Sequence, residues 1–469
     1  MRSQPTVPAA TARAAAPAAP AARAASAAPP PAGARRRLAP ARSAQVAAAA
    51  LGLLITVSAC GDGNKESSST TSPAAPTTSA SASASHSATA SKSASPSPSH
   101  SATHKPTVAP PPRTTTAKPA SCVDRAANAM SDAQRVGQLF MTAVSSTGMT
   151  RAESTAITEH KVGAVILMGH TNGGTAAVRG VTGRVRALAP DVRGAKVEMI
   201  ISTDQEGGQV QVLNGPGFSA MPEAVTQGTW STGALRADAA TWGRQLKAAG
   251  VNMNLAPVAD TVPRDLVDTN APIGKLHREY GNDPASVGSH SKAFLQGMQD
   301  AGVIPTPKHF PGLGRVAGNT DLTANVKDTV TTREDPSLEP FRTAVKAGAP
   351  FVMISSAVYT KIDPAHQAAF SSTVIRDMLR GSLGFRGAVI SDDLGQAVAV
   401  SDLTPAQRAL SFLRAGGDMV LTVKPSDIAP MTSAVLSRLP KDAALRKDVD
   451  DSVHRVLTAK RNAGLLTCR

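Results

Sequence analysis

Eight short apolar runs between residues 139 and 422 constrain the fold of this chain more than any other feature. They lack the polar alternation of a strand with one wet face, so we interpret them as strands buried on both faces of a parallel sheet. Amphipathic stretches of helical period separate them. This alternation predicts an α/β domain, a single (β/α)8 TIM-type barrel; a doubly wound open sheet is the alternative. The expected strands cover 139–144, 162–167, 197–203, 251–257, 304–309, 351–357, 387–392 and 418–422, and the clearest helices 234–249, 284–301, 338–347, 372–383 and 404–415.

An export signal is predicted for residues 1–59. Arg residues at 35–37 precede an apolar stretch at 46–57, which is too short to span a bilayer comfortably and ends in Val-Ser-Ala-Cys. This ending resembles the lipobox of bacterial lipoproteins, which implies that Cys60 is diacylated and becomes the first mature residue. The alternative is an ordinary signal peptide with a chance Cys. A start codon further downstream would fit the unusual length of the basic region.

Residues 60–120 are rich in Ser, Thr, Ala and Pro and have few large apolar side chains. Such a segment cannot bury enough surface to offset its ordering entropy, so we expect a disordered tether. The barrel domain is expected over 121–469. Residues 1–59 hold seven Arg, no Lys and no acid, and without them the formal net charge falls from +15 to +8 (15 − 7). The remaining charge is weak evidence for nucleic-acid binding, which is not expected.

Two further cysteines lie at the ends of the expected domain, Cys122 and Cys468. Domain termini often lie close together, and an even pair in an oxidising compartment favours a disulfide. We therefore expect a Cys122–Cys468 bond. The alternative is two unpaired thiols, and a zinc site is not expected because no His lies nearby at ligand spacing.

Polar residues collect where the expected strands end. Asp204, Asp260, the pair Lys308-His309 and Asp392 each follow a different apolar run. Barrel enzymes place their active sites at the carboxyl ends of the strands, so these side chains are expected to meet at one face. One such Asp alone would indicate little, because Asp after a strand often caps a helix.

Three motifs within these segments resemble a known family. Asp-Gln-Glu-Gly-Gly begins at 204, Lys-His-Phe-Pro-Gly-x-Gly at 308, and Ile-Ser-Asp-Asp-Leu at 390. In this order and spacing they resemble bacterial β-N-acetylglucosaminidases of glycoside hydrolase family 3, and the resemblance covers about 125–466. The chain ends 77 residues (469 − 392) after Asp392, so we expect a single barrel without the second domain of many relatives.

The resemblance implies roles for individual residues. The first Asp of the Ser-Asp-Asp motif is the family's nucleophile, which is Asp392 here. The positions that hold the terminal sugar in the family correspond to Asp204, Arg278, Lys308 and His309. Asp393 is expected to be structural or to orient Asp392. The alternative for Asp392 is a helix-capping Asp.

The chain departs from the family pattern on the loop after the Lys-His motif. The acetylglucosaminidases carry a second His at the position of Leu313, and Asp-Ser-His where this chain has Asn319-Thr320-Asp321. The family's acid/base His is therefore replaced by Asp321. A carboxyl group can take this role if burial or a nearby carboxylate raises its pKa, so we predict Asp321 as the acid/base. The alternative is a loop Asp in a turn. Gln209 likewise replaces the family's usual Arg.

These features predict a retaining β-glycosidase, lipid-anchored on the extracellular face of the membrane and acting on terminal β-linked N-acetylhexosaminides from the cell wall. The expected partners are a carbohydrate substrate, with peptidoglycan fragments among the candidates, and the membrane, through the lipid on Cys60. The protein is expected to be a monomer. The alternatives are a β-glucosidase-like specificity and a catalytically weak sugar-binding lipoprotein. No cofactor or metal is expected, because the ten His form no pair at ligand spacing such as His-Glu-x-x-His.

Overall fold

The computed structural model describes residues 120–468. The expected export signal, the lipidation of Cys60 and the tether up to residue 119 lie outside the described residues. Within 120–468, no helix combines the length and the apolarity needed to cross a membrane.

The described chain forms a parallel eight-stranded barrel. The strands follow the order β10-β13-β14-β1-β2-β4-β7-β8, and every ladder between neighbours is parallel. Phe310, just beyond β8, closes the ring: its N–H donates to the carbonyl of Met353 (2.8 Å), and its carbonyl accepts from Ser355 (2.9 Å). The predicted barrel is confirmed, and the open-sheet alternative is wrong. The strands are β1 (Phe140–Ser145), β2 (Ala164–Met168), β4 (Ile200–Thr203), β7 (Met253–Asn254), β8 (Ile304–Pro305), β10 (Phe351–Ile354), β13 (Ala388–Asp393) and β14 (Met419–Thr422).

Several strands are shorter than the apolar runs predict, and two of them are far shorter. β7 and β8 each contain two residues, whereas the runs extend to 257 and 309. Proline explains the difference, because Pro257, Pro305 and Pro307 have no N–H to donate to a ladder. Beyond these prolines the chain continues as irregular backbone at the rim of the barrel.

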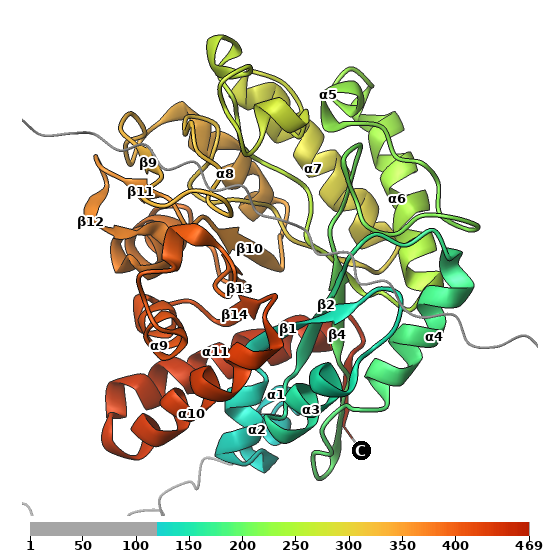
Figure 1. Ribbon diagram of the computed structural model, residues 1–469, viewed down its shortest axis with the longest axis vertical. Helices are drawn as coiled ribbons and strands as arrows, with labels where there is room; N and C mark the ends of the chain where they lie inside the picture. Colours follow the sequence, from blue (N-terminus) through green and yellow to red (C-terminus); the bar gives the residue numbers. More distant parts are fainter. Residues whose placement is uncertain (1–119, 469) are drawn as a thin grey trace, which may run out of the picture. The chain divides into compact units, whose positions relative to one another are not determined.

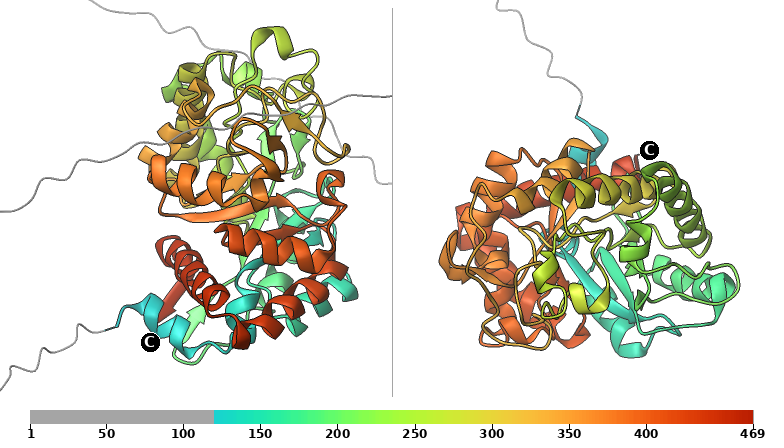
Figure 2. Two further views of the ribbon diagram at one scale, coloured as in Figure 1. Left: turned by 90° about the vertical axis from the view of Figure 1, so that its left-hand side faces the viewer. Right: turned by 90° about the horizontal axis from the view of Figure 1, so that it is seen from above.

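Helices surround the barrel on its outer side (Figures 1 and 2). Their ends follow local sequence signals. Asp283 caps α7 with Pro284 in its first turn, and Thr404 caps α9 through a reciprocal capping box with Gln407. The helices are α1 (Cys122–Ala129), α2 (Asp132–Gly137), α3 (Arg151–Glu159), α4 (Gly174–Arg186), α5 (Ala224–Gln227), α6 (Thr232–Ala248), α7 (Pro284–Asp300), α8 (Glu339–Lys346), the π-type helix η5 (Thr373–Ser382), α9 (Pro405–Ala415), α10 (Ile428–Arg438) and α11 (Ala443–Asn462).

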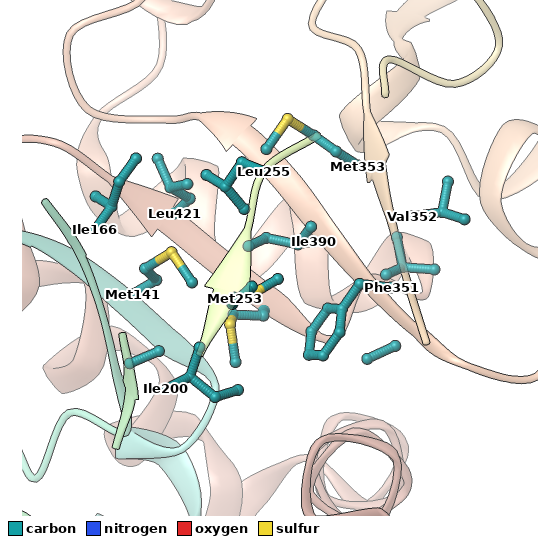
Figure 3. Packing of buried hydrophobic residues seen from close by; sticks show 14 of the residues in the cluster. Met141, Ile166, Ile200, Met253, Leu255, Phe351, Val352, Met353, Ile390 and Leu421 are labelled. Atoms are coloured by element: carbon teal, nitrogen blue, oxygen red, sulfur yellow. The ribbon is translucent and has the colours of Figure 1, made fainter. Parts of the chain in front are cut away.

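Apolar side chains fill the barrel interior (Figure 3). On β10, Phe351 and Met353 point inward whereas Val352 points outward, as the two-residue repeat of a strand requires. Facing residues from other strands, such as Met141 and Ile390, are completely buried. The interior is thus a packed core rather than a channel, which leaves the strand ends as the place for a binding site.

The two ends of the domain meet on the face opposite those strand ends. Cys122, at the start of α1, forms a disulfide with Cys468, with their Cα atoms 5.7 Å apart. Cys468 belongs to β15 (Leu466–Cys468), which pairs antiparallel with β3 (Ala195–Val197). Figure 2 shows α1 beside the C-terminal end of the chain.

Candidate active site

A pocket of about 520 Å³ opens at the carboxyl ends of the barrel strands. All six side chains that the sequence singles out for catalysis or sugar binding line this pocket. They come from the segments that follow β4, β7 and β8 and from the end of β13, so the barrel brings together residues that lie far apart in the chain. These six residues are Asp204, Arg278, Lys308, His309, Asp321 and Asp392.

Lys308 is the centre of a buried charge cluster on one wall. Its ammonium Nζ lies 2.6 Å from Asp204 Oδ1 and 2.7 Å from Glu206 Oε1. Burial alone would lower the pKa of Lys308, but the charges of the two carboxylates outweigh it and the pKa is raised. Lys308 therefore stays charged and is held at a fixed place by two acceptors.

Glu206 joins Lys308 to a second cation. Both oxygens of Glu206 accept from the guanidinium of Arg278, each at 2.8 Å, in a bidentate pair. Burial alone would raise the pKa of Glu206, but Arg278 and Lys308 lower it to about 2. A third Arg278 nitrogen donates to the carbonyl of Pro272 (2.7 Å), which fixes the plane of the guanidinium. The wall thus presents two positive charges of defined orientation.

Asp260 orients the neighbouring His309. The carboxylate of Asp260 is fully buried; Oδ2 lies 2.7 Å from His309 Nδ1, and Oδ1 accepts the backbone N–H of His309 (3.2 Å). Nδ1 of His309 is thereby assigned as the proton-bearing nitrogen, because a carboxylate only accepts. Asp260 Oδ1 also accepts the N–H of Leu313 (2.7 Å), so the same carboxylate anchors the start of the next loop.

The two acids at the end of β13 have different surroundings. Asp393 is buried and accepts three backbone N–H groups, from Gly395 (2.8 Å), Gln396 (2.8 Å) and Val423 (2.9 Å). The first two bonds close the turn after β13, and the bond from Val423 fastens the end of β13 to the segment after β14. Asp392 is half-buried and lines the pocket, and its Oδ1 accepts the N–H of Asp393 (2.9 Å). Asp393 also lines the pocket, but both of its oxygens accept backbone N–H groups, so Asp392 is the acid of the pair that is better placed to meet a ligand.

The loop that carries Asp321 is held over the pocket at both ends. The side chain of buried Asn270 donates to the carbonyls of Leu313 and Val316, each at 2.7 Å. At Gly314 a Cβ atom would lie 1.8 Å from the carbonyl oxygen of Thr261, so only glycine fits there. Further along, Val398 and Ala399 donate their N–H groups to the carbonyls of Asp321 (3.2 Å) and Thr320 (3.0 Å).

This loop places Asp321 near Asp392. As a residue Asp321 is exposed at the rim, but its carboxyl lies among the pocket-lining groups and is partly desolvated there. This desolvation is the largest cause that raises the pKa of Asp321 to about 6, and the charge of Asp392 is the next. Two carboxyl groups that share a site and differ in protonation can divide the roles of acid and nucleophile.

A family model described as the glycosyl hydrolase family 3 N-terminal domain matches residues 133–459. The chain belongs to glycoside hydrolase family 3. β-Hexosaminidases of Xanthomonas campestris pv. campestris and Xanthomonas oryzae pv. oryzae are 34% and 32% identical to it; the alignments cover 66% of this chain and 91% and 90% of theirs. The solved structure of β-N-acetylhexosaminidase from Beutenbergia cavernae DSM 12333 is 46% identical, with a TM-score of 0.70 over 71% of this chain and 99% of that one.

Membership of glycoside hydrolase family 3 confirms the resemblance predicted from the three motifs, and with it the prediction of a glycoside hydrolase. The family pattern as it appears in the sequence indicates no role for Glu206 and Asp260, although both lie where strands end. Their contacts identify them as the groups that hold Arg278, Lys308 and His309. The only sequence signal for them was position, since each acid follows an apolar run.

The departure from the family 3 pattern also has a structural counterpart. Leu313, at the position of the family's second His, is buried and lines the pocket with its side chain. Gln209, in place of the usual Arg, lies exposed on the same pocket. The loop thus reaches the pocket with Leu313 and Asp321 at the two positions where the family pattern has His.

Proposed function

We propose that the protein is a retaining β-N-acetylhexosaminidase that removes terminal β-linked N-acetylhexosamine residues. The relatives named above carry β-hexosaminidase and β-N-acetylhexosaminidase names, and the similarity to them spans nearly their whole length. The pocket matches this activity in size, since about 520 Å³ is enough for one sugar with part of its leaving group.

In the proposed reaction Asp392 attacks the anomeric carbon and Asp321 protonates the glycosidic oxygen. The bond to the leaving group breaks, the aglycone departs as an alcohol, and a glycosyl-enzyme forms on Asp392. Asp321, now a carboxylate, takes a proton from a water molecule that attacks the same carbon. The sugar is released with its configuration retained, and Asp392 is regenerated as a carboxylate.

The charge cluster binds the sugar ring in this proposal. Lys308 and Arg278 donate to ring hydroxyls, Asp204 accepts from them, and His309 offers the nitrogen that is not bonded to Asp260. Bonds to charged partners are about twice as strong as neutral ones. Because Glu206 and Asp260 hold these groups before a ligand arrives, little ordering entropy is lost on binding.

The observation that carries the proposal is that Asp321 and Asp392 line one pocket, where desolvation and the charge of Asp392 raise the pKa of Asp321 to about 6. An Asp that served only a turn would have no need of a second carboxyl group beside it in the pocket. An acid/base residue instead needs a pKa close to the working pH.

The experiment is a panel of nitrophenyl β-glycosides, with N-acetylglucosamine, N-acetylgalactosamine and glucose as the sugars. We expect turnover of the N-acetylated substrates, with the first-formed anomer retained when followed by NMR. Preference for the glucoside, or an inverted product, would contradict the proposal. The variant Asp402→Asn, an exposed acid outside the pocket, is the matched control for Asp321→Asn.

We further propose that the chain is exported and anchored by a lipid on Cys60, so that the barrel acts on wall-derived fragments at the extracellular face. The basic, apolar and small-residue order of residues 35–60 supports this. Metabolic labelling with an alkyne fatty acid should mark the wild-type chain and not the Cys60→Ser variant. Equal labelling of both would contradict it.

A further inference from the structure

An exposed apolar side chain, Leu322, lies at the rim of the pocket beside Asp321. Among residues 120–468, the large apolar side chains with high exposure are Leu322 (77%), Val330 (50%) and Val398 (37%). Single exposed apolar residues need no explanation. Two of these, however, flank the candidate acid: Leu322 follows it in the chain and lines the pocket, and the N–H of Val398 donates to its carbonyl.

The backbone that carries Leu322 is fixed. The side chain of Asn319 accepts the N–H of Asp321 (2.9 Å), and the carbonyl of Asn319 accepts the N–H of Leu322 (3.0 Å). The bonds from Val398 and Ala399 attach this turn to the segment after β13. Leu322 therefore keeps a set position relative to Asp321 although its side chain is open to water.

The position of Leu322 next to Asp321 indicates which part of a substrate its side chain would contact. In the proposed reaction Asp321 delivers its proton to the oxygen between the sugar and the leaving group. The charge cluster around Lys308 holds the sugar on the pocket wall. The surface beside Asp321 at the rim then faces the leaving group, because that group begins at the protonated oxygen.

We propose that Leu322, which lines the pocket, forms an apolar subsite for the leaving group together with Val398, whose neighbour Ala397 lines it, and that this subsite favours aglycones with an apolar chain or face next to the glycosidic bond. This inference rests on the proposed function. Apolar contact at this place lowers the free energy of the transition state by removing the exposed surface of Leu322 from water. It contributes no hydrogen bond, so it selects for apolar area rather than for one aglycone.

The test is kcat/KM for a series of n-alkyl β-N-acetylglucosaminides from methyl to hexyl. Their alcohol leaving groups have similar basicity, so differences report contact with the protein. Full burial of one methylene would raise kcat/KM about fourfold, and contact on one side at an open rim about twofold. We expect about twofold per methylene in the wild type, and a nearly flat series in Leu322→Asn and in the double variant with Val398→Thr.

The controls use the same substitutions elsewhere. Val330→Asn alters an exposed apolar residue outside the pocket and should keep the wild-type slope. Leu322→Met, which retains an apolar side chain at the subsite itself, should keep it as well. A flat series in the wild type, or an unchanged slope in Leu322→Asn, overturns the subsite. If the methyl glycoside is still turned over in that case, the proposed function stands. Absence of turnover with every glycoside, the nitrophenyl panel included, contradicts the proposed function, and the subsite with it.

Discussion

Asp321 and Asp392 line the same pocket, and the pKa of Asp321 is raised to about 6, first by desolvation and then by the charge of Asp392. The two acids come from different segments, the loop after β8 and the end of β13. Their proximity is maintained by the bonds that Val398 and Ala399 donate to the loop. This arrangement makes the predicted replacement of a catalytic His by an Asp chemically workable.

The pH dependence of kcat/KM should show an alkaline limb near pH 6. Asp321 donates a proton only while protonated, and its pKa is raised from 3.8 to about 6. It is therefore mostly protonated below pH 6 and loses its proton as the pH rises through that value. Rates with an alkyl glycoside between pH 4 and 9 measure this limb. A profile that stays flat to pH 8 would contradict the acid role.

The variant Asp321→Asn should separate substrates by their leaving groups. With an alkyl aglycone the loss of the acid should lower kcat/KM by about 10²- to 10⁴-fold. With a dinitrophenyl aglycone, which departs without a proton, the loss should be small and the alkaline limb should disappear. The control Asp402→Asn should match the wild type with both. Equal losses on both substrates would indicate a general distortion of the site.

Covalent labelling should identify Asp392 as the nucleophile. A 5-fluoro glycosyl fluoride of N-acetylglucosamine should raise the mass of the wild-type protein by one sugar, on the peptide that contains Asp392. The variant Asp392→Ala should remain unlabelled and lose turnover by on the order of 10³-fold or more. Asp393→Ala should lose stability, since three backbone N–H groups lose their acceptor, but the label should still form. Label on another residue would disprove the assignment.

The sequence predicts the barrel well because its signals are local. Buried strands appear as unbroken apolar runs, and the residue after each run lies at the face of the barrel that carries the site. The pairings inside the site are not local. Glu206 meets Arg278 across 72 residues and Asp260 meets His309 across 49, so the choice of partners depends on the register of the closed barrel. No residue pattern indicates that Asn270 would hold the Asp321 loop.

Removal of the disulfide should destabilise the domain without changing the site. The Cys122–Cys468 bond joins residues 346 apart, at the face opposite the pocket. A bond that closes a long loop typically contributes about 2–4 kcal/mol by restricting the unfolded chain. The double variant Cys122→Ser/Cys468→Ser should therefore unfold at a lower urea concentration, with kcat/KM unchanged. Reductant should shift the midpoint of the wild type toward that of the variant and leave the variant unaffected.

Glu206 should be essential for both the stability and the affinity of the site. The variant Glu206→Gln leaves the buried cations Arg278 and Lys308 with one carboxylate, Asp204, and an amide group that cannot accept through its nitrogen. Breaking a buried pair in this way costs about 3–5 kcal/mol. We expect this loss in urea unfolding, together with a raised KM because Arg278 and Lys308 are no longer held in place.

The control for this change is Glu223→Gln, which breaks an exposed pair with His277 and should cost less than about 1 kcal/mol. The loss of folding stability at low pH distinguishes the Glu206 and Glu223 variants further. The pKa of Glu206 is lowered from 4.5 to about 2, so its contribution is present above pH 4.5 and is lost as the pH falls through about 2. Over that window the wild type should lose stability more steeply than Glu206→Gln, whereas Glu223→Gln should follow the wild type. Parallel curves for all three proteins would show that the buried cluster does not hold the site together.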